Sequence, residues 1–268
     1  MSQNLQLKLK KIESFSKHYE ALMTCENIAF TKAESWDRVR RDWWYALLFF
    51  FDRAFYKGRN DTLSQKFERA TIKALETVLV GSSSEKLSEL QGLTYWLIHE
   101  QWERPENPLW EALSQEYEIG NKKTGVGRGK DKKFVLASMD FIVKHCEGYN
   151  IIEYAIGHIQ QRNTRLVYDE ILNIYDVGPK VAALFLRDVV FIYKLEGFLK
   201  ERDYDCLMPI DTWIKQIGKR LEISVTAENM VDLCQDNKVS PILFNQGAWY
   251  LGKHSFDILL DNIHAIIA

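Results

Sequence analysis

The sequence predicts an all-α protein. Apolar residues recur at helical spacing in one segment after another, and no segment shows the alternation of a half-buried strand. Capping residues and glycines bound most of these segments. With 268 residues, of which 46% are hydrophobic, the chain can bury a large core. We expect about ten or eleven helices, with no internal repeat and no linker between independent halves.

The first strongly apolar segment is predicted to be one long helix. Ser35 can cap a helix over 36–57, and Gly58 can end it. Five bulky aromatic residues within this helix are expected to form part of the core: Trp43, Trp44, Phe49, Phe50 and Phe51.

Capping signals also place the next helices. Thr62–Gln65 has the form of a capping box and predicts a helix over 66–80 that ends at Gly81. Ser82–Glu85 repeats the signal and begins another helix. Two prolines then interrupt the chain, at Pro105 and Pro108.

The C-terminal half is predicted to continue in helices after a loop at 120–130. The segment 132–146 has helical spacing, and Asn150 can cap the helix that follows it. A serine cap followed by proline at the first helical position, Ser240-Pro241, begins a late helix.

The total charge and the cysteines restrict the function classes. The net charge is −2, so a protein that binds duplex DNA would need a local basic patch. The four cysteines are scattered, without a CxxC pair or zinc-ligand spacing, which favours free thiols in a reducing cytoplasm, near the nucleoid in a prokaryote. We expect no secretory leader and, without a run of ~20 apolar residues, no membrane segment.

One segment, 121–133, could supply a basic patch. Its cations are Lys122, Lys123, Arg128, Lys130, Lys132 and Lys133, against the single acid Asp131. They could contact backbone phosphates, and a solvated run of charges is the alternative. The segment is not a P-loop, because it lacks the glycine–lysine spacing and the following Ser or Thr.

The segment 172–190 reads as a helix, a tight turn and a second helix. The first amides of the second helix have no partner within the helix, and its dipole favours an anion. Gly178 allows the backbone to approach a ligand closely. Val177, Gly178 and Val181 are therefore candidates for contacting a DNA phosphate.

The alternative for this segment is an αα-corner that binds no ligand. Asp176 favours that alternative, because a carboxylate repels a phosphate unless it points away or holds a cation. A second motif follows at 207–221, where Asp211 precedes an amphipathic helix. The simplest role for that aspartate alone is a helix N-cap.

Together, the two segments resemble the helix-hairpin-helix DNA glycosylase superfamily. LNIYDVGPKVAALFLRDV and MPIDTWIKQIGKRL match its hairpin and the aspartate motif that follows, over residues 172–221. Lys180 falls at the position of the nucleophilic lysine, and Asp211 at that of the essential aspartate. The first hairpin glycine of the family is Asp176 here.

Within the superfamily, the chain looks most like the archaeal-type 8-oxoguanine DNA glycosylase/lyases. The spacing from Lys180 to Asp211 is longer than in endonuclease III, and no cysteine follows Cys234. The resemblance therefore implies no iron–sulfur cluster. It implies no organic cofactor and no metal in the active site, while a monovalent cation at the hairpin stays open.

The resemblance also implies two helical subdomains with the active site in the cleft between them. The terminal subdomain would comprise 1–50 plus 212–268. The central subdomain, 51–211, would carry the hairpin at about 170–190.

The implied activity is removal of a damaged base from double-stranded DNA, 8-oxoguanine first, followed by strand cleavage. Lys180 would attack C1′ of an extruded nucleotide and form a Schiff base, and β-elimination would follow. Asp211 would stabilise the positive charge that develops on the sugar. We expect a monomer. The alternatives are a glycosylase for alkylated bases and a non-catalytic helix-hairpin-helix DNA-binding protein.

The late helix is predicted to supply the base pocket. Trp249 could stack on an extruded base, and Asn245, with Gln246 beside it, could bind a base edge. Core packing is the alternative for Trp249. Arg59 and Asn60 are candidates for a loop that wedges into the duplex, with a solvated loop as the alternative.

Overall fold

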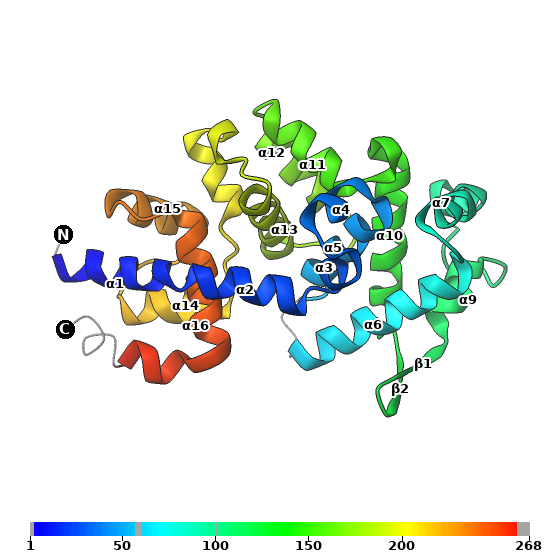
Figure 1. Cartoon of the computed structure of the whole chain (residues 1–268), viewed down its shortest axis with the longest axis horizontal. Helices are drawn as coiled ribbons and strands as arrows, with labels where there is room; N and C mark the ends of the chain where they lie inside the picture. Colours follow the sequence, from blue (N-terminus) through cyan, green and yellow to red (C-terminus); the bar gives the residue numbers. More distant parts are fainter. Residues whose placement is uncertain (1–2, 57–60, 100, 262–268) are drawn as a thin grey trace.

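A computed structural model describes residues 3–56, 61–99 and 101–261 of the chain, without the side chains of residues 3 and 255–261 (Figure 1). These residues form 16 α-helices and one two-stranded sheet, so the predicted all-α class is confirmed. The helices outnumber the ten or eleven expected, because many are short and separated by capping residues. No helix within these ranges is long and apolar enough to cross a membrane.

The elements follow one another along the chain in this order. They are α1 (Gln3–Ser14), α2 (Ser16–Glu26), α3 (Ile28–Ala33), α4 (Trp36–Arg41), α5 (Trp43–Ala54), α6 (Asp61–Val78), α7 (Ser83–Gly92), α8 (Thr94–Ile98), α9 (Pro108–Ser114), β1 (Glu116–Ile119), β2 (Lys122–Gly125), α10 (Gly129–His145), α11 (Ile151–Gln160), α12 (Thr164–Leu172), α13 (Pro179–Ile192), α14 (Thr212–Arg220), α15 (Ala227–Asp236) and α16 (Pro241–Asp261). Three short 3₁₀ segments complete the order: η1 (Glu147–Tyr149), η2 (Glu196–Phe198) and η3 (Glu201–Leu207).

The prediction of one helix over 36–57 is wrong, because the chain breaks at Asp42. Asp42 adopts an extended conformation, and its carboxylate accepts a hydrogen bond from the Trp44 amide at 3.0 Å. Aspartate competes in this way with the helical hydrogen bonds of the backbone. The result is a short α4, capped by Ser35 as predicted, and a separate α5.

The predicted stop at Gly58 lies outside the described residues, and the capping predictions within them are confirmed with one exception. The exception is Thr62–Gln65, which lies inside α6 because this helix already begins at Asp61. An acidic residue in the first turn suits the positive end of a helix dipole. The capping box at Ser82 forms as predicted. The predicted start at Asn150 is found at α11, and the predicted start at Ser240-Pro241 is found at α16.

The predicted loop at 120–130 is partly a β-hairpin. Strands β1 and β2 pair antiparallel around a turn in which Gly120 has a φ of 64°. Glycine at the first position of a two-residue turn is typical of hairpins. The strands are too short to show an alternating pattern in the sequence, which is why the helical spacing did not reveal them.

Two clusters of buried side chains make up the core. The larger contains five aromatic residues of α5 that are each 5% exposed or less, so the core prediction for Trp43, Trp44, Phe49, Phe50 and Phe51 is confirmed. The smaller joins α1 to α14, α15 and α16, which lie together at the left of Figure 1. Helices α2 to α5 contribute to the larger cluster, so the division between clusters does not fall at residue 50. The predicted subdomain limits stay a prediction.

Close packing between α1 and α16 depends on Gly247. A Cβ atom at this position would lie 1.9 Å from the carbonyl oxygen of Ile12. That oxygen belongs to the α1 backbone and cannot rotate away. The two terminal helices can therefore approach this closely only with glycine at position 247.

We predict that Gly247→Ala lowers the free energy of unfolding by about 1–3 kcal/mol, because α1 must move away from α16. Urea denaturation measures the change. Gly157→Ala is the matched control: it lies within α11 with nothing within 4 Å of the added atom, and should raise stability by about 0.5–1 kcal/mol. Equal effects of the two substitutions would contradict the packing argument.

Candidate functional site

The predicted helix–turn–helix segment consists of α12, a turn at 173–178 and α13. Gly178 is the N-cap of α13, with φ −104° and ψ 173°, and Pro179 is its first helical residue. Nothing lies within 4 Å of the Cβ that Gly178 lacks, so its backbone is open to a ligand. Val177 and Val181 are 7% and 3% exposed, so their side chains pack in the core and only their backbone could contact a phosphate.

Asp176 takes the place of a glycine in this turn through its backbone conformation. Its φ of 63° lies in the left-handed region, which non-glycine residues rarely adopt. Aspartate tolerates this region better than most residues. The turn therefore has the backbone shape that a glycine would give, with an exposed carboxylate added to it.

Lys180 lies in the first turn of α13 and reaches across to the end of α5. Its ammonium group donates a hydrogen bond to the backbone carbonyl of Tyr56, with a distance of 3.0 Å between Nζ and O. The side chain is partly buried. This contact holds the amine at the N-terminal end of α13, beside the residues that line the pocket described below.

Asp211 caps α14, as its position in the sequence predicts. Its carboxylate accepts a hydrogen bond from the Ile214 amide at 2.9 Å. Burial raises the pKa of Asp211 above its usual value, and the Ile214 amide and the positive charge of Lys180 oppose that rise. Asp211 is therefore both a helix cap and a carboxylate that interacts with the charge of Lys180.

The segment that precedes Asp211 is held in place by Asn245. The Asn245 amide nitrogen donates to the carbonyl oxygen of Pro209 at 3.2 Å, and its oxygen accepts a hydrogen bond from Arg187. Asn245 is 2% exposed. The prediction that Asn245 binds a base edge disagrees with this placement, because the protein itself uses both ends of the amide.

Gln246 does not line the pocket either. It is fully buried, and neither its amide oxygen nor its nitrogen has a hydrogen-bond partner among the residues that the structure describes. Trp249, the third residue predicted for the base pocket, does line a pocket. Its ring meets the ring of Tyr19 edge-on, with 5.3 Å between centroids.

The pocket that Trp249 lines is partly open to solvent and lies close to Lys180. Helices α2, α5, α6, α13 and α16 surround it. Leu184, one helical turn after Lys180 on α13, forms part of its wall. Tyr56, whose carbonyl binds Lys180, forms another part. Lys180 is therefore connected to the pocket wall in two ways: through Leu184 on the same helix and through its hydrogen bond to Tyr56.

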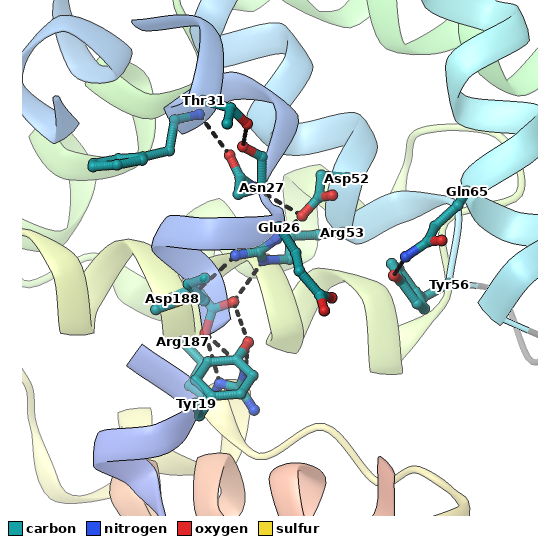
Figure 2. A network of polar contacts seen from close by, with 12 residues as sticks. Tyr19, Glu26, Asn27, Thr31, Asp52, Arg53, Tyr56, Gln65, Arg187 and Asp188 are labelled. Atoms are coloured by element: carbon teal, nitrogen blue, oxygen red, sulfur yellow. Dashed lines mark hydrogen bonds and ion pairs between the residues drawn. The ribbon is translucent and has the colours of Figure 1, made fainter. Parts of the chain in front are cut away.

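A buried polar network connects these elements (Figure 2). Its centre is the pair Arg187–Asp188 on α13, and neither residue is exposed. The Asp188 carboxylate accepts hydrogen bonds from the Tyr19 hydroxyl at 2.8 Å and from Nε of Arg53 at 2.6 Å. Arg53 also pairs with Asp52, which accepts a hydrogen bond from the Asn27 amide.

The charges of this network balance. Two arginines, Arg53 and Arg187, face two aspartates, Asp52 and Asp188. Burial alone would raise the pKa of Asp188, but Arg187 and Arg53 hold it below its usual value. Asp188 is therefore ionised throughout the neutral range.

We predict that Asp188→Asn lowers the free energy of unfolding by about 3–5 kcal/mol, because it leaves two buried guanidinium groups with one carboxylate fewer. Urea denaturation at pH 7 measures the loss. Asp37→Asn is the control, since Asp37 forms an exposed ion pair with Arg41 that should contribute at most about 1 kcal/mol. A loss at Asp188 no larger than at Asp37 would show that the network is not structural.

The predicted basic residues are exposed but share their surface with acids. Lys122, Lys123, Arg128 and Lys130 are exposed, and Glu118 of β1 lies opposite Lys123 in the hairpin. Two further cations are used elsewhere: Lys132 bonds the Ser114 hydroxyl, and Lys133 pairs with Glu103. The hairpin packs on α6, which also lines the pocket. Arg59 and Asn60 lie outside the described residues.

Sequence reasoning missed three residues of the pocket and its frame. Arg187 and Asp188 interrupt an apolar helix, a signal that two charges are buried together. Glu68 falls on the buried face of α6, between Ser64 and Thr71. An acid at that spacing on an apolar face is the signal that could have identified it.

Comparisons with known proteins add no identification. No protein-family model matches the chain, and neither a curated protein nor a solved structure matches it. Within the described ranges, no cluster of three or more His, Cys, Asp or Glu side chains could hold a metal ion. Function is therefore inferred from the residues and their geometry.

Proposed function

We propose that the protein is a DNA repair glycosylase with an associated β-elimination lyase activity, and that it removes an oxidised purine, 8-oxoguanine first. The observation that carries this proposal is one arrangement of three parts. An amine at a helix N-terminus, Lys180, acts electrostatically on the partly buried carboxyl group of Asp211. A pocket that is partly open to solvent lies beside that amine, and Trp249 and Leu184 are among the residues that line it.

The turn between α12 and α13 would bind the DNA backbone as a helix-hairpin-helix motif. The first amides of α13 have no partner within the helix, and the helix dipole favours an anion at that end. The open backbone at Gly178 supports this role. A phosphate bound there would bring its nucleotide close to Lys180, which is two residues along the chain.

Lys180 would be the nucleophile. In its neutral form the amine attacks C1′ of the extruded nucleotide, and the bond from C1′ to the base breaks, with the electron pair leaving on the base. Opening of the sugar ring gives a protonated Schiff base between Nζ and C1′. Loss of a C2′ proton then expels the 3′ phosphate, and water releases the lysine.

Asp211 would stabilise positive charge on the sugar during the first step. A carboxylate near the sugar stabilises the positive charge that develops as the base leaves, and it can accept a proton from the lysine. Asn245 and Arg187 would be positioning residues, since they hold the Pro209 carbonyl just before Asp211. Trp249 would stack on the base in the pocket.

We predict a covalent protein–DNA adduct when the protein is incubated with an 8-oxoguanine duplex and borohydride, because borohydride reduces a Schiff base. Lys180→Gln should abolish the adduct. Lys219→Gln, an exposed lysine of α14, is the control and should keep it. Base release without an adduct would indicate an enzyme without the lyase step, and DNA binding without release would favour a non-catalytic binding protein.

We predict that Asp211→Asn reduces base excision by about 100-fold or more, because the carboxylate charge is lost while the cap remains. Asparagine caps a helix as well as aspartate does, so the free energy of unfolding should change by less than about 1 kcal/mol. Single-turnover excision and urea denaturation measure the two effects. Asp42→Asn, at the cap of α5, should leave excision unchanged. Normal excision by Asp211→Asn would limit Asp211 to capping.

A further inference from the structure

Resting on the proposed function, we propose that the carboxyl group of Glu68 binds the extruded base through adjacent N–H and C=O groups, and that it selects neutral oxidised purines over cationic alkylated ones. Glu68 lies on α6 and lines the same pocket as Trp249 and Leu184. It is 1% exposed. Its Oε1 atom has no hydrogen-bond partner in the part of the chain that the structure describes.

A buried carboxyl oxygen without a partner is rare in folded proteins, because burial removes its water. Two of the polar side chains that line the pocket with it are bound by other groups. Arg53 is bound by Asp188 and Asp52, and Gln65 donates to the Tyr56 hydroxyl at 3.4 Å. A ligand in the pocket would supply the partner that Glu68 lacks.

Burial raises the pKa of Glu68 to about 8, against the opposing charges of Arg53 and Arg69. The other ionisable groups that line the pocket are Tyr19 and Glu26 from α2, and Asp52 and Tyr56 from α5 and the residues after it. Burial also raises the pKa of both tyrosines, so they are neutral in the same range. At neutral pH, Glu68 is therefore an uncharged acid with one O–H donor and one C=O acceptor.

This donor–acceptor pair matches one kind of base edge. 8-Oxoguanine carries N–H and C=O side by side on its five-membered ring, where guanine has only a bare nitrogen acceptor. A neutral acid can form two hydrogen bonds to the oxidised edge and only one to the other. Alkylated purines such as 7-methylguanine are cations, which an ionised carboxylate would attract and a neutral acid does not.

The test compares single-turnover base release from an 8-oxoguanine duplex between pH 6.5 and 9.5. Glu68→Gln keeps a neutral donor and acceptor at every pH, so the ratio of wild-type to variant rate should fall about tenfold per pH unit above about pH 8. Any pH dependence that the two proteins share cancels in the ratio. Glu68→Met should lose about tenfold or more at every pH. Glu76→Gln, on the exposed side of α6, is the control.

A second measurement needs no change at Glu68. The affinity of Lys180→Gln for the 8-oxoguanine duplex, relative to the undamaged duplex, should fall above about pH 8. A rate ratio and a relative affinity that do not change with pH would overturn the proposal. So would faster release of 7-methylguanine than of 8-oxoguanine.

The proposed function is tested separately by wild-type protein with an abasic-site duplex and borohydride. No base enters the pocket in that reaction, so an adduct depends on Lys180 and not on base recognition. An adduct there, together with a pH-independent rate ratio, would overturn the role of Glu68 alone. Failure to form the adduct would overturn the proposed function itself.

Discussion

The buried pair Arg187–Asp188 is the interaction on which the geometry of the site depends. Asp188 binds Tyr19 on α2 and Arg53 on α5, while Arg187 binds Asn245 on α16. Through Asn245 the network also holds the segment before Asp211. Since Lys180 lies on the same helix, about two turns earlier, a single helix sets the position of the amine relative to the carboxyl group. Of the helices around the pocket, α2, α5, α13 and α16 are joined by this network.

Such a network fixes the relative positions of the helices more than it stabilises the fold. Taking four charged groups out of water is costly, and their mutual attraction offsets that cost only if every partner is present. An apolar core of equal volume could be as stable. It would not specify which face of α5 or α16 meets α13, whereas directional hydrogen bonds do. The proposed reaction would need an amine and a carboxyl group held near the same carbon, and such rigid support would suit it.

The sequence predicted what depends on local patterns and missed what depends on contacts between distant segments. Helical spacing and capping residues gave the class and most helix starts, and the cap at Asp211 was visible because it needs only the next three residues. Asp42 broke a helix because its side chain competes with the backbone, which periodicity does not report. Helical spacing places Asn245 on the same side of its helix as Trp249, so the sequence predicts that Asn245 lines the pocket. Only the fold shows that Arg187 and Pro209 occupy its amide.

Three acidic side chains near the pocket differ in charge state because their surroundings differ. Two arginines keep Asp188 ionised. Burial raises the pKa of Asp211, while a helix amide and the charge of Lys180 oppose that rise. Glu68 is buried like the others, but the guanidinium group with the largest opposing effect on its pKa, that of Arg53, is bound to Asp188 and Asp52. The network that fixes the frame thus also engages the charge of Arg53. In the proposed site, loss of Asp188 would leave Arg53 with one carboxylate partner fewer, and its charge would then favour the ionised form of Glu68. The structural pair and the proposed recognition of a base are therefore coupled through one arginine.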